Sequence, residues 1–191
     1  MAQKSILVMA VLLLLSLVPS GFAFDGYRSG FILGFGLGPG ITSNGDSHFG
    51  LQTDFRIGAG VNEQVQVYWS SKVSWYSVDY YVIRGFDYYS GDLYYSTDSG
   101  IGVFGQGGLG VSYYFQPETP SWFITGGVGY SSYAIMASDN VSDSEFGMGL
   151  SGGLGYEFSP HLNVEGGIRF GSPGEGNSLT SIMICLNALA Y

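Results

Sequence analysis

Apolar residues alternate with polar or small residues along almost the whole chain after residue 23. In the segment 65–76, the odd positions carry mainly valine and tryptophan, whereas the even positions carry glutamine, tyrosine, serine and lysine. Successive side chains of a β-strand point to opposite faces of its sheet, so this pattern predicts a strand with one apolar face. The same period recurs in eight segments, which is typical of the strands of a membrane β-barrel.

The eight expected strands lie at 30–39, 49–61, 65–76, 101–115, 122–136, 146–158, 162–170 and 179–191. The last of them has an ambiguous pattern. Its odd positions carry Met183, Cys185, Leu189 and Tyr191 but also Asn187, whereas its even positions are wholly apolar. The pattern therefore leaves the orientation of this strand open.

The composition agrees with a sheet protein, because the chain has 32 glycines, 16% aromatic residues and only 11% charged residues. Glycine inside a helix costs about 1 kcal/mol, which argues against a helical or α/β enzyme, and disordered chains lack aromatic residues. The formal net charge of −9 and the lack of a basic stripe argue against a nucleic-acid partner. The single cysteine, Cys185, permits neither an intrachain disulfide nor a multi-cysteine metal site.

Residues 1–23 have the pattern of a secretory signal peptide. Lys4 precedes an apolar run from Ile6 to Val18, and Gly21 and Ala23 are the small residues of a cleavage site. This run is shorter than the roughly 20 residues that a transmembrane helix needs. We therefore expect a signal peptide at 1–23 and one barrel domain at 24–191.

The lengths of the connections indicate which face of each strand meets water. A soluble, lipocalin-like barrel would turn its apolar faces inward, a membrane barrel would turn them outward, and the period alone does not distinguish the two. The expected connections alternate between short and long, and the longest spans 77–100. Short turns alternating with long loops, together with an even strand number, are typical of outer-membrane barrels. We predict an all-β fold: an eight-stranded antiparallel up-and-down transmembrane β-barrel.

Two glycine- and aromatic-rich segments, Gly126–Tyr130 and Gly153–Ile168, resemble the outer membrane protein β-barrel domain family, which comprises OmpA-like and opacity-protein-like eight-stranded barrels. The resemblance covers essentially residues 24–191. It implies a location in the outer membrane, in contact with lipid and lipopolysaccharide. It also implies that Tyr191 is a terminal assembly signal for the barrel-assembly machinery, although Asn187 departs from the usual ending of the last strand.

Charged residues on the inward faces are expected to form a network in the lumen. An isolated buried charge costs several kcal/mol, so three acids and three bases in a narrow interior should form ion pairs. We expect such pairs to plug the barrel, and the alternative is a narrow gated channel whose selectivity the charges set. The predicted lumen network comprises Asp54, Arg56, Lys72, Glu157, Glu165 and Arg169.

The long connection 77–100 is the best candidate for a contact surface outside the membrane. Tyrosine offers a large, rigid and amphipathic contact area at low entropic cost. The alternation at 87–97 also suggests that the two flanking strands continue as a hairpin above the membrane. The expected contact residues are Tyr80, Tyr81, Tyr88, Tyr89, Tyr94 and Tyr95. All the long connections together are acidic, with Asp46, Asp79, Asp87, Asp92, Asp98, Asp139, Asp143 and Glu175 against the single base Arg84.

Motifs of enzymes and cofactor sites are weak in this chain. Gly105–Gly110 and Gly147–Gly152 match the dinucleotide-binding pattern G-x-G-x-x-G, but no helical pattern follows either one. A barrel hydrolase acting on lipid A would need a Ser–His–acid arrangement, for which His48 with Ser43 or Ser47 and Asp46 is conceivable. The other histidine, His161, is expected in a short turn at the opposite rim. We therefore expect no enzyme, no cofactor and no metal site.

The sequence favours a non-enzymatic outer-membrane protein that acts in envelope integrity or in surface interaction such as adhesion. Its expected partners are lipid, lipopolysaccharide, the barrel-assembly machinery and a host or surface ligand. The alternatives are a narrow channel for ions or small solutes, the lipid A hydrolase, and the soluble lipocalin-like barrel.

Overall fold

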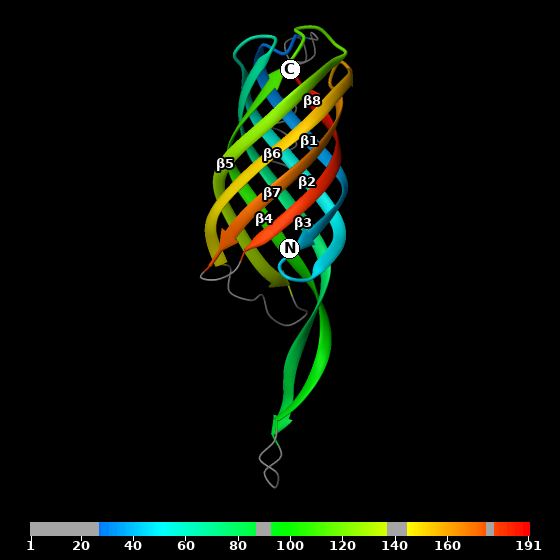
Figure 1. The fold of residues 1–191 in the computed structure, drawn as a ribbon, viewed down its shortest axis with the longest axis vertical. Coiled ribbons are helices and arrows are strands. Elements are labelled where there is room, and N and C mark those ends of the chain that lie inside the picture. Colours follow the sequence, from blue (N-terminus) through cyan, green and yellow to red (C-terminus); the bar gives the residue numbers. More distant parts are fainter. Residues whose placement is uncertain (1–26, 87–92, 137–144, 175–177) are drawn as a thin grey trace, which may run out of the picture.

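The protein is a single closed barrel of eight antiparallel strands in chain order, with β8 pairing back to β1 (Figure 1). The computed structural model describes residues 27–86, 93–136, 145–174 and 178–191. The strands are β1 (Gly30–Ser43), β2 (Ser47–Gly60), β3 (Val65–Phe86), β4 (Leu93–Tyr114), β5 (Ser121–Met136), β6 (Glu145–Ser159), β7 (Leu162–Pro173) and β8 (Leu179–Ala190). The described residues include no helix that is long and apolar enough to cross a membrane. The predicted fold class is confirmed, whereas the expected signal peptide lies outside the described residues.

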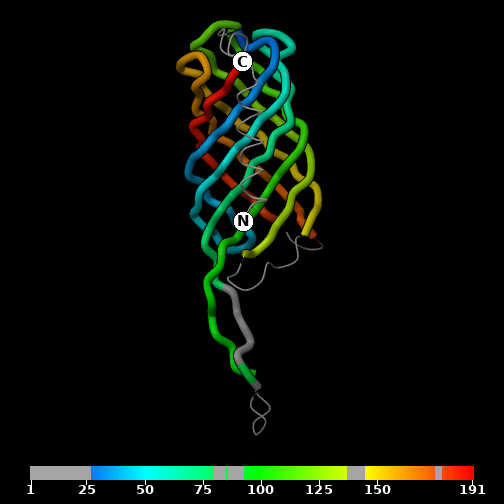
Figure 2. Tube along the Cα trace, turned by 180° about the vertical axis from the view of Figure 1, so that it is seen from behind, coloured from blue at the N-terminus to red at the C-terminus, as the bar shows by residue number. Residues whose placement is uncertain are grey.

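Two strands are much longer than the sequence pattern predicted. β3 and β4 each have 22 residues and stay paired out to Phe86 and Leu93, with a register shift between Ile83 and Gly85. Their neighbours stop earlier, because β2 pairs with β3 only to Tyr76 and β5 pairs with β4 only to Ile101. The described residues of 77–100 therefore form a two-stranded ribbon, which we call the hairpin extension. It leaves the barrel at the end opposite to the short turns and the C-terminus (Figures 1 and 2).

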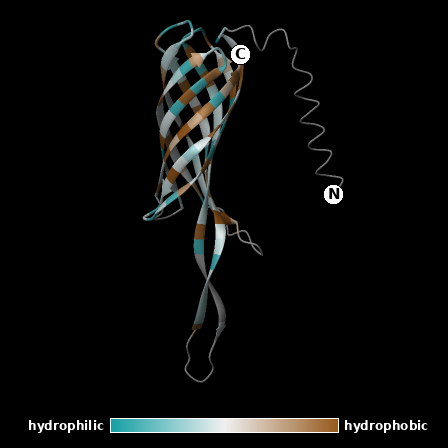
Figure 3. Cartoon of the chain, turned by 90° about the vertical axis from the view of Figure 1, so that its right-hand side faces the viewer, coloured by the Kyte–Doolittle hydropathy of each residue, from teal (hydrophilic) through white to brown (hydrophobic). Residues whose placement is uncertain are grey.

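The barrel has an apolar outer surface and a polar interior. Large apolar side chains such as Phe35, Trp122 and Leu150 are exposed, whereas Gln52, Asp54 and Arg169 are almost fully buried. Brown, apolar residues recur along the barrel strands in Figure 3. This arrangement contradicts the lipocalin-like alternative, in which the apolar faces would line the cavity.

The structure also settles the orientation of the last strand. Met183, Cys185, Asn187 and Leu189 of β8 are buried in the interior, whereas its even positions, among them Ile184, are exposed on the outer surface. The pattern was ambiguous because most of the inward residues of β8 are themselves apolar. They pack within the barrel, where Leu189 contacts Ile32 and Tyr191.

Glycine lets neighbouring strands approach closely at one side of the barrel. A Cβ atom added at Gly129 of β5 would collide with the backbone of Gly107 and Gly108 in β4. The same addition at Gly126 of β5 would meet no atom within 4 Å. Two glycines three residues apart on one strand thus differ in the space that surrounds them.

This difference predicts opposite tolerance to a methyl group. We expect Gly129→Ala to lower the free energy of unfolding by about 1–3 kcal/mol, because the backbone of β4 must move to admit the new atom. Gly126→Ala is the control and should change it by less than about 0.5 kcal/mol. Urea unfolding of the refolded chain in detergent, followed by tryptophan fluorescence, measures both. Equal effects of the two substitutions would contradict the close approach of β4 and β5.

Candidate functional site: lumen network and hairpin extension

The charged side chains of the lumen are arranged in layers along the barrel axis. The register of β2 and β3 gives the order, because Arg56 pairs with Ser70, Asp54 with Lys72, and Gln52 with Ser74. β3 runs from the short-turn end toward the hairpin extension. The layer of Gln52 therefore lies nearer to the extension than the layer of Asp54.

The central layer is a four-residue ion cluster built from β2, β3 and β7. The Nη2 atom of Arg56 lies 2.5 Å from Asp54 Oδ2 and 2.5 Å from Glu165 Oε2. Lys72 Nζ lies 3.0 Å from Glu165 Oε1 and 3.8 Å from Asp54 Oδ2. All four side chains are almost fully buried, and the ring of Tyr68 covers the guanidinium of Arg56 at 5.1 Å. Two acids and two bases make the cluster neutral, as buried charges require.

A second group closes the short-turn end of the barrel. Glu157 accepts hydrogen bonds from Arg28 and from the hydroxyl of Tyr191, and both partners are buried. Arg28 also donates to the backbone oxygens of Gln116 and Pro117, each at 2.9 Å, and lies over the ring of Tyr114. One guanidinium thus ties the segment before β1 to the β4–β5 turn and to β6.

Arg28 was missed by the sequence analysis because it precedes the first expected strand. The available signal was its phase, since Arg28 continues the even-numbered inward face of Ile32 and Gly34. Its presence changes the pairing of the predicted network. Glu157 pairs with Arg28 and is not part of the central ion cluster.

Arg169 of β7 lies in a layer without a carboxylate partner among the described residues. Its Nη2 atom donates to Gln52 Oε1 at 2.5 Å, to Ser181 Oγ at 3.2 Å and to Ser74 Oγ. The ring of Phe104 lies 5.2 Å from its guanidinium carbon. Beyond this layer an apolar cluster of Tyr76, Val78, Phe104 and Leu179 fills the lumen toward the hairpin extension.

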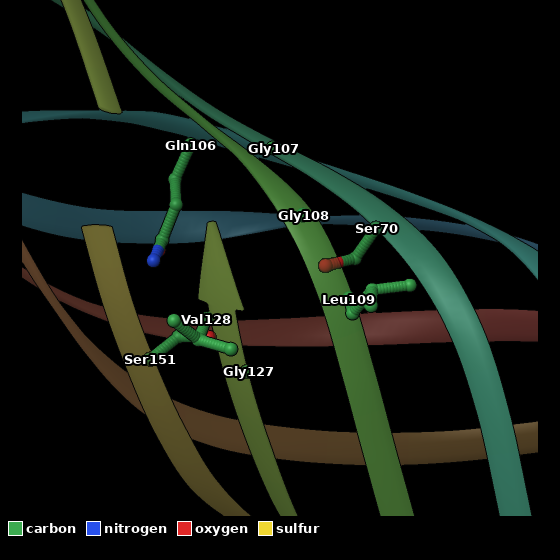
Figure 4. A pocket seen from close by; sticks show the side chains of 8 residues that line it. All are labelled: Ser70, Gln106, Gly107, Gly108, Leu109, Gly127, Val128 and Ser151. Carbon is green, nitrogen blue, oxygen red and sulfur yellow. The ribbon is translucent and has the colours of Figure 1, made fainter. Parts of the chain in front are cut away.

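A small hollow interrupts the packing beside β4. It is too narrow to hold a water molecule and is lined by Ser70, Gln106, Gly107, Gly108, Leu109, Gly127, Val128 and Ser151 (Figure 4). The side-chain oxygen of Gln106 is buried and makes no hydrogen bond within the described part of the chain. The dinucleotide-like motif Gly105–Gly110 thus lies on β4 of a closed sheet, without the following helix that a nucleotide site requires.

Four of the six predicted contact tyrosines lie in the strands of the hairpin extension. Tyr94 and Tyr95 of β4 are 58% and 61% exposed. The backbones of Tyr80 and Tyr81 pair with Asp98 and Thr97. Tyr88 and Tyr89 lie outside the described residues.

The histidines do not form the arrangement that a hydrolase needs. The ring of His48 stacks on Tyr76 at a centroid distance of 5.2 Å. Among the described residues, His48 forms no hydrogen bond with Ser43, Ser47 or Asp46. His161 lies at the other end of the barrel, where its Nδ1 is 3.0 Å from the oxygen of Leu189.

The fold is that of known eight-stranded surface barrels. One similar structure is Ail, the attachment invasion locus protein of Yersinia pestis, in complex with the heparin analogue sucrose octasulfate. It has 10% sequence identity and a TM-score of 0.51, covering 84% of this chain and 99% of that one. Neisserial surface protein A (NspA) has 14% identity and a TM-score of 0.51, covering 84% and 97%. The predicted resemblance to eight-stranded outer-membrane barrels is confirmed at the level of the fold.

Comparisons of sequence alone give no further identification. No protein-family model matches the chain, and no curated protein matches it. At 10–14% identity, the structural similarity shows the fold alone. One fold can host many functions, so this fold does not determine what the protein does.

The central ion cluster makes a prediction about stability. Glu165→Gln leaves Arg56 and Lys72 with a single carboxylate, so we expect the free energy of unfolding to fall by about 3–5 kcal/mol. Glu118→Gln removes an acid from an exposed turn and should change it by less than about 0.5 kcal/mol. Urea unfolding in detergent compares the two variants. A loss at Glu165 no larger than that at Glu118 would show that the cluster does not stabilise the barrel.

Proposed function

We propose that this protein is a non-enzymatic outer-membrane barrel that contacts other surfaces through its hairpin extension. A location in the membrane is supported by the apolar outer surface, since such a large exposed apolar area is rare in soluble monomers. The shortest strands have 12 residues, and a membrane-spanning strand needs about 9–11. In this proposal the short turns face the periplasm, the hairpin extension faces outward, and the signal peptide 1–23 directs export.

The observation that carries the proposed contact role is the projection of β3 and β4 beyond the rest of the barrel. β3 continues from Ser77 to Phe86 after its pairing with β2 has ended. At about 3.3 Å per residue, these residues extend roughly 30 Å. A two-stranded ribbon is only marginally stable alone in water and has two unpaired edges. Contact with a partner would stabilise it, as expected of an adhesive surface.

The charge of the outer end indicates which partners fit. In the described residues, Asp79 and Asp98 lie on the hairpin extension and Asp46 lies in the β1–β2 connection. The only base of the long connections is Arg84. Ail was solved with a sulfated heparin analogue, but an acidic surface would repel such a polyanion. We propose a basic or uncharged partner that packs on the exposed rings of Tyr94 and Tyr95.

Further partners follow from the same location. Lipid and lipopolysaccharide would surround the apolar outer surface, and the packed barrel would contribute to envelope integrity. We also propose that the barrel-assembly machinery recognises Tyr191 as a terminal assembly signal before the barrel closes. In the folded chain, its ring is buried and its hydroxyl donates to Glu157.

The contact role predicts that an exposed ring at the outer end matters more than an equally exposed ring elsewhere. We expect Tyr95→Ser to weaken binding to target cells or to an isolated ligand at least about fivefold, since truncating an aromatic anchor costs more than about 1 kcal/mol. Tyr27→Ser is the matched control, because Tyr27 is 62% exposed at the periplasmic end and Tyr95 is 61% exposed. Binding by whole cells that display each variant at equal levels gives the measurement. Equal binding by the two variants would refute the contact role of the hairpin extension.

The second candidate function is a narrow channel, which the polar lining of the lumen favours. The layers of buried ion pairs and the apolar cluster around Phe104 support instead a plugged lumen that does not conduct ions. We therefore expect little conductance from the unmodified protein in planar bilayers. Conductance should rise when Arg56 or Arg169 is neutralised by glutamine, because each substitution disrupts a layer. A large open conductance of the unmodified protein would favour the channel.

A further inference from the structure

The lumen carries one positive charge more than its acids balance. Among the described residues, the buried bases are Arg28, Arg56, Lys72 and Arg169, and the buried acids are Asp54, Glu157 and Glu165. Glu157 pairs with Arg28, and the other two acids pair with Arg56 and Lys72. The charge of Arg169 is the one left over. A guanidinium does not lose its proton in proteins, so its charge has to be met in another way.

Arg169 also has hydrogen-bond donors to spare. Its Nε and Nη1 atoms are buried and make no hydrogen bond in the described part of the chain. The side-chain nitrogen of Gln52 is also buried and makes no hydrogen bond in that part, although Gln52 Oε1 accepts a hydrogen bond from Arg169 Nη2. Arg169, Gln52, Ser74 and Ser181 are at most 1% exposed. A buried donor without an acceptor loses its hydration and gains no hydrogen bond in return, so these atoms require an acceptor between them.

None of the neighbouring protein acceptors makes a hydrogen bond with Nε or Nη1 of Arg169 in the described part of the chain. Asp54 is the carboxylate that acts on Arg169 electrostatically. Its Oδ2 atom pairs with Arg56 and Lys72, and its Oδ1 atom is buried but makes no hydrogen bond with Arg169. The four-residue cluster to which Asp54 belongs is neutral as a whole. On another side, Phe104 offers only the face of its ring.

We infer that Arg169, together with the amide nitrogen of Gln52, binds a small monatomic anion of the size of chloride inside the lumen. The anion accepts hydrogen bonds from the free donors and neutralises the surplus charge. Its small size follows from the packing, because Ser74, Ser181 and Phe104 around the guanidinium are fully buried. This inference does not depend on the proposed contact role of the hairpin extension.

The position of the site determines how the anion enters. Tyr76, Val78, Phe104 and Leu179 cover the layer on the side of the hairpin extension. The central ion cluster covers it on the periplasmic side. The anion is therefore enclosed as the barrel folds, and an experiment has to supply it during refolding rather than afterwards.

The test compares the full chain refolded in detergent from urea in sodium chloride, sodium bromide or sodium gluconate at equal concentration. Gluconate is too large for the site. We expect the apparent melting temperature to be about 2–4 °C higher in either halide than in gluconate, which is the shift expected for about 1 kcal/mol in a chain of this size. Arg169→Gln should lose this difference, whereas Glu118→Gln should keep it. Equal melting of the unmodified protein in all three salts, or a halide effect that persists in Arg169→Gln, would overturn the inference.

A second measurement uses the unmodified protein and so does not depend on the folding of a variant. Crystals of protein refolded in bromide should show an anomalous peak within hydrogen-bond distance of Arg169 Nε or Nη1. The same crystals grown after refolding in gluconate should show none. A bromide crystal with a water or no peak at Arg169 would show that the guanidinium is solvated without an anion.

Discussion

Closure of the sheet is the constraint on which the rest of this structure depends. With β8 paired to β1, the backbone hydrogen bonds of the barrel are made between strands, and no edge is left within the closed part. Only such a closed sheet, or a helix, satisfies the backbone in a lipid environment. Closing eight strands also leaves an interior just wide enough for side chains. The inward residues are then forced into contact, which turns the charges of distant strands into neighbours such as Arg56 and Glu165.

The narrow interior explains why each buried arginine has several kinds of partner. Arg28, Arg56 and Arg169 each lie over an aromatic ring, namely Tyr114, Tyr68 and Phe104. A ring face attracts the cation and also fills space, so the ring packs against the guanidinium without adding a second charge to the lumen. A carboxylate accompanies Arg28 and Arg56 but not Arg169. The three guanidiniums thus share one packing solution and differ in how their charge is compensated.

Much of this fold could be predicted from the sequence because the physical cause of the pattern is local. Alternating side chains place Trp122 outside and Phe123 inside wherever the strand lies, and all eight strands were found on that basis. The orientation of β8 could not be predicted from the pattern. Met183 and Leu189 are apolar yet face inward, so the two faces of the strand differ little in polarity. The bounds of β3 and β4 were predicted too short, although the alternation at 87–97 indicated that the two strands continue as a hairpin above the barrel.

The pairing of the lumen charges is a different kind of problem, because it depends on the stagger of all eight strands. The inward phase of Glu157 is visible in the sequence, but its partner Arg28 lies 129 residues away and before the first strand. The predicted network of three acids and three bases is balanced. Arg28 adds a fourth base, so one base is left without a carboxylate, and the geometry decides which one. The alternation therefore predicts which charges enter the lumen, whereas only the closed register decides that Arg169 is the one without a carboxylate.

The same closure divides the molecule into a part whose strands are paired on both sides and a part with unpaired strand edges. Within the barrel the backbone is paired, the ion pairs are buried, and a substitution acts mainly on stability. The hairpin extension has open edges, exposed rings such as Tyr95, and the acids Asp79 and Asp98. A ribbon of two strands is only marginally stable alone in water, and its open edges can pair with another chain. The open edges and exposed rings on which the proposed contact role rests therefore begin where the sheet stops closing on itself.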